Sequence, residues 1–156
     1  DLAAAVAARL ERQTLLYTDR RFDFLITEAA LRWRPGPPSV LLAQLDRLRN
    51  VSTLDNVSLG LIPLDRPATT CISHSFVIYE NDDNEAGTGG QRTDGSEYVE
   101  VETIHANLTT HDPDDVRLYR GRWERLAKMA LFDADARQFL TDLAADIGAA
   151  DGGPAC

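Results

Sequence analysis

The chain has 156 residues, 44% hydrophobic and 26% charged, which are the proportions of an ordinary globular protein with its own core. Its formal net charge of −9 argues against direct DNA binding, because clustered Lys and Arg supply most of the non-specific affinity for phosphate. Cys71 and Cys156 form no CxxC pair and no apolar run is long enough to span a membrane, so we expect a cytoplasmic protein without a disulfide or zinc site.

The predicted elements of the first half alternate between helices and strands. Residues 2–17 have leucines near helical spacing among alanines, and a strand at 22–26 leads into helix-forming residues at 28–32. After the prolines that end this stretch, Ser39 is expected to cap a helix over 39–50, and a strand follows at 57–63.

The second half predicts two strands and two helices. Strands are expected at 76–79 and 98–103, separated by the polar segment 81–96, whose four glycines indicate a mobile hairpin loop rather than a phosphate-binding loop. Asp112 is the expected cap of a helix that begins at Pro113, and Asp133 the expected cap of the last helix.

Together these elements predict a single α+β domain over residues 1–148, followed by a disordered tail at 149–156. The expected order is αβαβββαα, with a small mixed, mostly antiparallel sheet of about four strands and helices packed against it. One βαβ step is expected to precede the antiparallel strands.

Three carboxylates are candidates for a binding or catalytic site. Strand alternation places Glu100 and Glu102 on one face, and Glu28 at the end of the first strand could join them. Neighbouring carboxylates can serve as acid and base, or bind a cationic ligand or an arginine of a partner. A solvated outer face is the competing interpretation.

Other candidate residues lie in the first third of the chain. Arg12 and Gln13 could pair with one of these carboxylates. Trp33, which lies between Arg32 and Arg34, is either a partner-facing aromatic or a packed core residue.

The remaining chemistry-bearing residues favour no catalytic site. His74, His105 and His111 form no close ligand pair, and His111 is expected in an exposed loop. Ser75 lies outside any nucleophile elbow, and Cys71 has no identifiable base. We therefore predict no catalytic residue, metal or cofactor.

Several stretches, taken in order, resemble one family. They are AARLERQTLL, FDFLITEAALRWR, QLDRL, NVSLGLIPL, SFVIYE, YVEVET and ANLTTHDPDDVRLYRGRWERLAKMAL. They resemble the C-terminal domain of actinobacterial Xre-type, antitoxin-like transcriptional regulators, the WhiJ-like proteins, over about residues 6–147.

The resemblance implies a regulatory domain that follows an N-terminal helix-turn-helix head, which binds the DNA. It also implies a small partner protein encoded nearby, or a small-molecule ligand, and suggests Arg12, Gln13, Glu28, Arg32 and Glu102 as the polar residues of interest. Because the chain begins at Asp1, we expect a fragment without this head or a stand-alone version of the domain.

The leading hypothesis is therefore a sensor or partner-binding domain that couples binding to a separate DNA-binding head. The first alternative is a stand-alone enzyme of natural-product biosynthesis that uses Glu28, Glu100 and Glu102. The second is a dimerisation module that uses the apolar first helix to form a homodimer.

Overall fold

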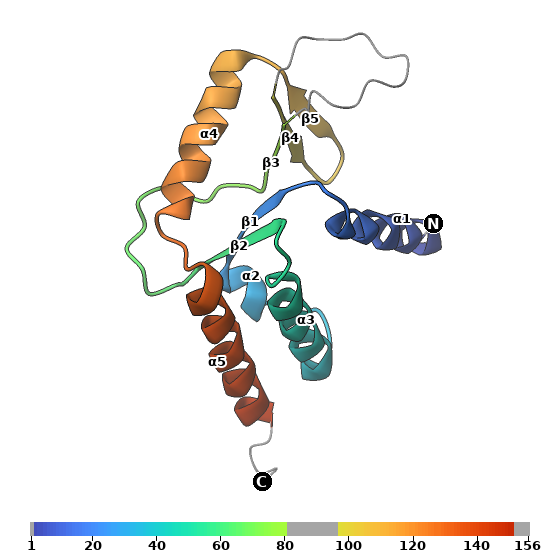
Figure 1. The fold of residues 1–156 in the computed structure, drawn as a ribbon, viewed down its shortest axis with the longest axis vertical. Coiled ribbons are helices and arrows are strands. Elements are labelled where there is room, and N and C mark those ends of the chain that lie inside the picture. The colour runs from blue at the N-terminus through green and yellow to red at the C-terminus, as the bar shows by residue number, and fades with distance from the viewer. Residues whose placement is uncertain (1, 81–96, 152–156) are drawn as a thin grey trace. The chain divides into compact units, whose positions relative to one another are not determined.

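The computed structural model describes residues 2–80 and 97–151 of the chain (Figure 1). Its elements in chain order are α1 (Leu2–Thr14), η1 (Leu15–Tyr17), β1 (Phe22–Thr27), α2 (Glu28–Arg32), α3 (Pro38–Val51), β2 (Val57–Ile62), β3 (Val77–Tyr79), β4 (Tyr98–Glu102), β5 (Asn107–Thr110), α4 (Pro113–Ala127) and α5 (Asp133–Asp151). They divide into two compact units: unit 1 takes the chain up to Arg66 and from Met129 onward, and unit 2 takes Pro67–Lys128.

Unit 1 is built on a parallel pair of strands. β1 and β2 run side by side with Phe22 opposite Val57 and Thr27 opposite Ile62, and α2 and α3 form the connection between them. The predicted βαβ step is thus confirmed. On β2 the backbone of Leu61 exchanges two hydrogen bonds with Leu131, at 2.9 and 2.8 Å.

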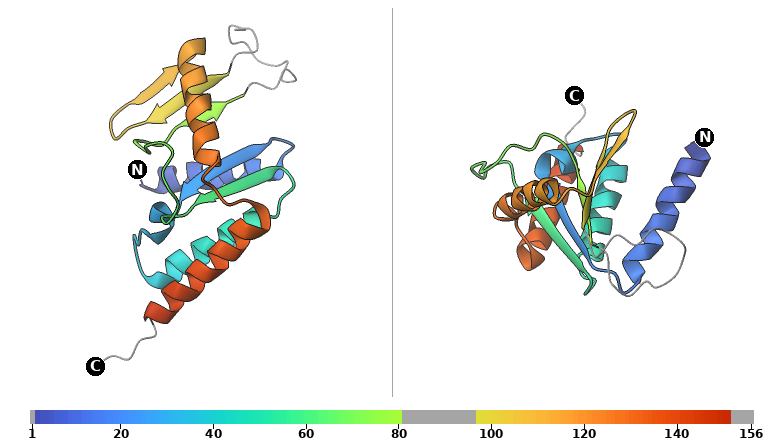
Figure 2. Two further views of the ribbon diagram at one scale, coloured as in Figure 1. Left: turned by 90° about the vertical axis from the view of Figure 1, so that its left-hand side faces the viewer. Right: turned by 90° about the horizontal axis from the view of Figure 1, so that it is seen from above.

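The core of unit 1 lies between β2 and two long helices. Figure 2 shows α3 and α5 packed side by side, in agreement with their extensive contacts. Leucines at helical spacing on both helices face the alternating leucines of β2. The buried cluster consists of Leu31, Leu41, Leu45, Leu59, Leu61, Ala136, Leu140, Leu143 and Ile147.

Gly60 permits a close approach on β2. A Cβ atom at this position would lie 2.5 Å from Cδ2 of Leu25 and 2.6 Å from Cε1 of Phe132. Because both contacts are far inside van der Waals distance, any larger residue would displace the Leu25 side chain or the Phe132 ring.

Unit 2 is an antiparallel three-stranded sheet with one helix against it. β4 is the central strand, paired with β3 through Tyr98 opposite Tyr79 and with β5 through Glu102 opposite Asn107. The buried residues Val99 and Val101 of β4 pack against Val116 of α4, on the face opposite Glu100 and Glu102. The unit has a small core of its own.

The α+β class and the mixture of parallel and antiparallel pairing are confirmed, but the single sheet of about four strands is wrong. In the described residues the strands form two sheets, one of two strands and one of three. A single residue pair, Leu61 with Leu131, adds to the pairing of β2. The strand β5 was not predicted, because its residues, Asn107–Thr110, show no apolar alternation.

The predicted helix ends are correct in one case and wrong in another. Asp112 caps α4 as predicted, its Oδ1 accepting the backbone N–H groups of Asp114 at 2.8 Å and Asp115 at 3.4 Å. Ser39 does not cap α3, because the helix begins one residue earlier, at Pro38.

The predicted domain limits have a mixed outcome. α5 continues to Asp151, so the first three residues of the predicted tail are helical. The predicted loop at 81–96 and the rest of the tail, residues 152–156, lie outside the described residues. A single domain over residues 1–148 stays a prediction.

Candidate functional site

One face of the sheet in unit 2 gathers aromatic and acidic side chains away from α4. Val99 and Val101 face the helix, so Tyr98, Glu100 and Glu102 lie on the opposite side of β4. Residues paired directly across strands share a face, and the contact of His111 with Tyr98 adds that residue. We call this surface the outer face: Val77, Tyr79, Tyr98, Glu100, Glu102, Asn107, Thr109 and His111.

An aromatic row crosses the three strands of the outer face. The rings of Tyr79 and Tyr98 stack with centroids 4.7 Å apart and planes 11° apart. His111 continues the row, with its centroid 5.1 Å from that of Tyr98. His111 was predicted as an exposed loop residue, and it is exposed, but the prediction missed its contact with Tyr98 because β5 was not foreseen.

The two predicted carboxylates lie beside this row. Glu100 is half-buried and Glu102 exposed, and within the described residues neither forms an ion pair. Burial and the nearby negative charge of Glu100 together raise the pKa of Tyr98 above its ordinary value. The outer face thus combines aromatic surfaces with negative charge that has no described counter-charge.

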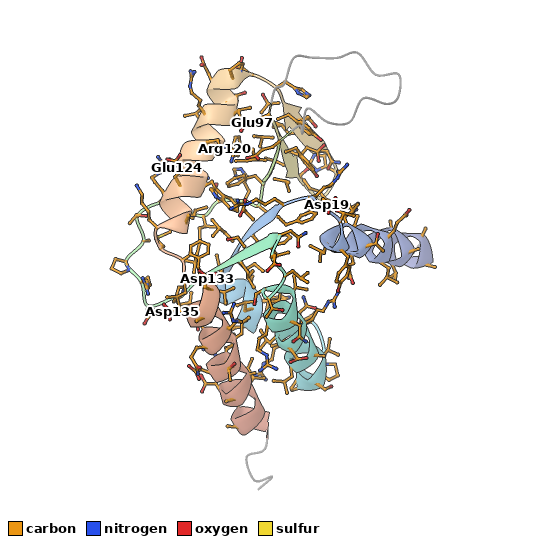
Figure 3. All side chains as sticks on the ribbon, viewed as in Figure 1. Asp19, Glu97, Arg120, Glu124, Asp133 and Asp135 are labelled. Carbon is orange, nitrogen blue, oxygen red and sulfur yellow. The ribbon has the colours of Figure 1, made fainter. Side chains whose placement is uncertain are left out.

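An arginine of α4 joins the strands on the other side of the sheet. Arg120 donates through Nε and Nη2 to the two carboxylate oxygens of Glu97, at 3.0 and 2.6 Å, and through Nη2 to Glu80 as well. Figure 3 shows Arg120 directed toward Glu97. The hydrogen bonds from Arg120 outweigh burial and hold the pKa of Glu97 below its ordinary value. We call these three residues the arginine clamp.

The two glutamates of the arginine clamp are the chain neighbours of the stacked tyrosines. Glu80 follows Tyr79 at the end of β3, and Glu97 precedes Tyr98 at the start of β4. One guanidinium therefore holds the end of one strand beside the start of the other. Such bidentate pairs fix geometry as well as charge. The clamp therefore positions Tyr79 against Tyr98.

A second polar network ends at the same helix. Ser73 Oγ accepts from Nη1 of Arg122 at 2.8 Å and lies 2.9 Å from Nδ1 of His74, whose Nε2 is 3.3 Å from the Tyr119 hydroxyl. The serine that contacts His74 is therefore Ser73, which precedes it in the chain. These residues fasten the segment before β3 to α4.

Glu28 lies in unit 1 and has its own partners there. Its Oε1 accepts from Nε of Arg32 at 2.6 Å, and its Oε2 accepts from the backbone N–H of Leu64 at 2.9 Å. Burial raises the pKa of Glu28, but these donors outweigh burial and the pKa lies below its ordinary value. Both oxygens are engaged, so Glu28 ties α2 to the end of β2.

The other predicted site residues of unit 1 are exposed. Trp33 has 74% of its surface exposed, so the packed alternative is wrong. Arg12 and Gln13 lie exposed on α1, and among the described residues neither has a polar partner. Val6 and Leu10 of the same helix are 46% and 58% exposed, and dimerisation through this helix stays a prediction.

Replacing Glu28 by glutamine should change how stability depends on pH. A carboxyl group whose pKa is lowered by folding stabilises the native state above its unfolded pKa, and that contribution is lost as the pH falls through the folded pKa. The wild type should therefore exceed Glu28→Gln in free energy of unfolding at pH 7, with the difference closing below about pH 4.

Urea titrations of both proteins between pH 3 and pH 7 measure this difference. Asp46→Asn is the control, because Asp46 is 56% exposed and its ion pair with Arg49 is a surface pair. A difference between wild type and Glu28→Gln that stays constant over the whole pH range would contradict the assignment.

Comparisons with known proteins identify a family but no characterised relative. The family model described as "Domain of unknown function (DUF5753)" matches residues 1–142. No curated protein and no solved structure matches the chain. Among the described residues, no helix has the length and apolar character needed to cross a membrane, and no three potential metal ligands lie together.

Proposed function

We propose, from the premise that this chain belongs to the DUF5753 family of domains of unknown function, that it is a regulatory, partner-binding domain. In this proposal it belongs to an antitoxin-like, Xre-type transcriptional regulator of the cytoplasm. Binding of a small partner protein to this domain alters the DNA affinity of a separate helix-turn-helix head. The ordered sequence resemblance to the WhiJ-like proteins supports this assignment.

The outer face is the observation that carries the proposal. Val77 is 49% exposed and Tyr79 is 39% exposed, and they adjoin the stacked Tyr98 ring and the carboxylate of Glu100. Exposed aromatic residues beside polar groups are typical of protein interfaces, where tyrosine is enriched. An open sheet face of this composition suits a protein surface better than a small molecule, which binds in a concave pocket.

Charge supports a division of labour with a separate DNA-binding head. From residue 51 onward there are eight basic and nineteen acidic residues, so this part of the chain repels a phosphate backbone. A partner that binds here can change DNA binding only if its affinity differs between two states of the whole regulator. In this division, the domain binds the partner with an affinity that depends on the state of the regulator, and the head binds the DNA.

Calorimetric titration of the chain with the small protein encoded beside it tests the proposal. We expect a 1:1 complex with a dissociation constant of about 1 μM or below. In the regulator that carries a helix-turn-helix head, saturating partner should change operator affinity by about 5-fold to 150-fold. Absence of heat and of co-elution at about 100 μM of each protein would refute partner binding.

A further inference from the structure

We propose that the outer face binds an arginine-bearing segment of a partner protein, with the guanidinium groups beside the aromatic row and against Glu100 and Glu102. This inference rests on the proposed function, because it names the chemistry of the surface through which the partner binds.

Charges in unit 2 are separated between the two sides of the sheet. In the described part of unit 2, every Lys and Arg lies on α4 or at its C-terminal cap, and α4 packs on the side opposite the outer face. Arg120 is one of these cations, and Glu97 and Glu80 at the ends of the strands already bind it. Glu100 and Glu102 therefore keep a negative field that a basic partner would complement.

The carboxylates beside the aromatic row make the surface selective for a flat cation. Tyr79 and Tyr98 are stacked, and Tyr98 is half-buried with Glu100 close enough to raise its pKa. A guanidinium stacks on an aromatic face and forms two parallel hydrogen bonds to a carboxylate, whereas an ammonium does neither as well. We therefore expect arginine to bind in preference to lysine.

The spacing of the carboxylates fits an extended partner segment. Glu100 and Glu102 are two residues apart on one strand, which corresponds to about 6.6 Å at a rise of ~3.3 Å per residue. Alternate residues of a second extended chain have the same separation, so two arginines at i and i+2 can reach both carboxylates. The exposed side chain of Val77, opposite Glu100, provides an apolar contact for the stem of an arginine.

Fluorescence anisotropy with defined peptides tests this chemistry on the full chain. The probe is a labelled peptide of alternating arginine and threonine, and its matched control replaces each arginine by citrulline, which has the same shape and no charge. We expect the arginine peptide to bind at least about 10-fold more tightly than the citrulline peptide. A lysine version should bind with intermediate affinity.

A charge-matched pair of protein variants locates the binding surface. Glu100→Gln/Glu102→Gln should weaken binding of the arginine peptide by about 10-fold and leave the citrulline peptide unchanged. Glu124→Gln/Asp142→Asn removes two exposed carboxylates elsewhere and should stay within about twofold of wild type. Circular dichroism and thermal unfolding establish that both variants remain folded.

Each outcome decides the inference. Equal loss of arginine-peptide binding in the two double variants would assign the binding to net charge and overturn the outer face as the site. Equal affinity for the arginine and citrulline peptides would overturn the cationic chemistry. If the partner protein binds the wild type and Glu100→Gln/Glu102→Gln equally well, the inference fails while the proposed function stands. If the arginine peptide binds as expected and the partner protein does not bind, the proposed function fails.

Discussion

Replacing Leu61 by alanine should lower the free energy of unfolding by about 3 kcal/mol, as expected for a large-to-small change in a closely packed core. Leu61 is 0% exposed and is the last residue but one of β2, where it belongs to the cluster formed with α3 and α5. Its backbone is held by two hydrogen bonds to Leu131, so β2 cannot shift to fill the space that the missing side chain leaves. Chemical denaturation followed by circular dichroism at 222 nm measures the loss.

Leu64→Ala is the matched control for this prediction. Leu64 lies three residues further along the chain and is 64% exposed, and its backbone N–H donates to Glu28. We expect a change within about 0.5 kcal/mol, because an exposed side chain contributes little to the core. Equal losses for the two variants would mean that Leu61 does not occupy the centre of the core.

Periodicity made the core of unit 1 predictable. Leu41 and Leu45 are four residues apart in the predicted helix over 39–50, and Leu59 and Leu61 alternate in the predicted strand at 57–63, and all four are buried. The buried leucines Leu140 and Leu143 of α5 follow the same rule. These assignments were correct because local spacing decides which apolar residues of a helix or strand share a face.

The arrangement of the strands was less predictable, since pairing depends on residues far apart in the chain. β5 consists of Asn107–Thr110 and joins the sheet through its backbone, after a turn in which Thr103 Oγ1 bonds the carbonyl of Ala106 at 2.7 Å. Local composition contains little information about such a strand. Without β5, the sequence could not place His111 beside Tyr98.

Half of the candidate surface could be predicted from the sequence. Alternation placed Glu100 and Glu102 on one face of a strand, and the structure agrees. That Tyr79 lies opposite Tyr98 follows from the register of β3 against β4, and a sequence alone does not give this register. Arg120 was missed, although one signal was available: it lies one turn after the buried Val116, and a charged residue on an apolar stripe needs a partner.

Replacing Arg120 by methionine should destabilise unit 2 by about 1 kcal/mol, because its carboxylate partners are partly exposed and screened by water, and should weaken binding of the arginine peptide. The substitution leaves Glu97, whose side chain is 39% exposed, beside Glu80 without the cation that neutralises them. Repulsion between the two carboxylates would separate the ends of β3 and β4, and with them the stacked rings of Tyr79 and Tyr98. The outer face should therefore lose affinity although the substituted residue lies on the other side of the sheet.

Tryptophan fluorescence can follow this unit alone. The sequence has two tryptophans, and in a Trp33→Phe background the remaining signal comes from Trp123 of α4. Arg117→Met is the control, because Arg117 is 74% exposed and pairs only with Asp114 among the described residues, so its loss should cost less than about 0.5 kcal/mol. If Arg120→Met matched this control in both stability and peptide affinity, the clamp would be no more than a surface ion pair, and the stacking of Tyr79 on Tyr98 would depend on the backbone pairing of β3 with β4.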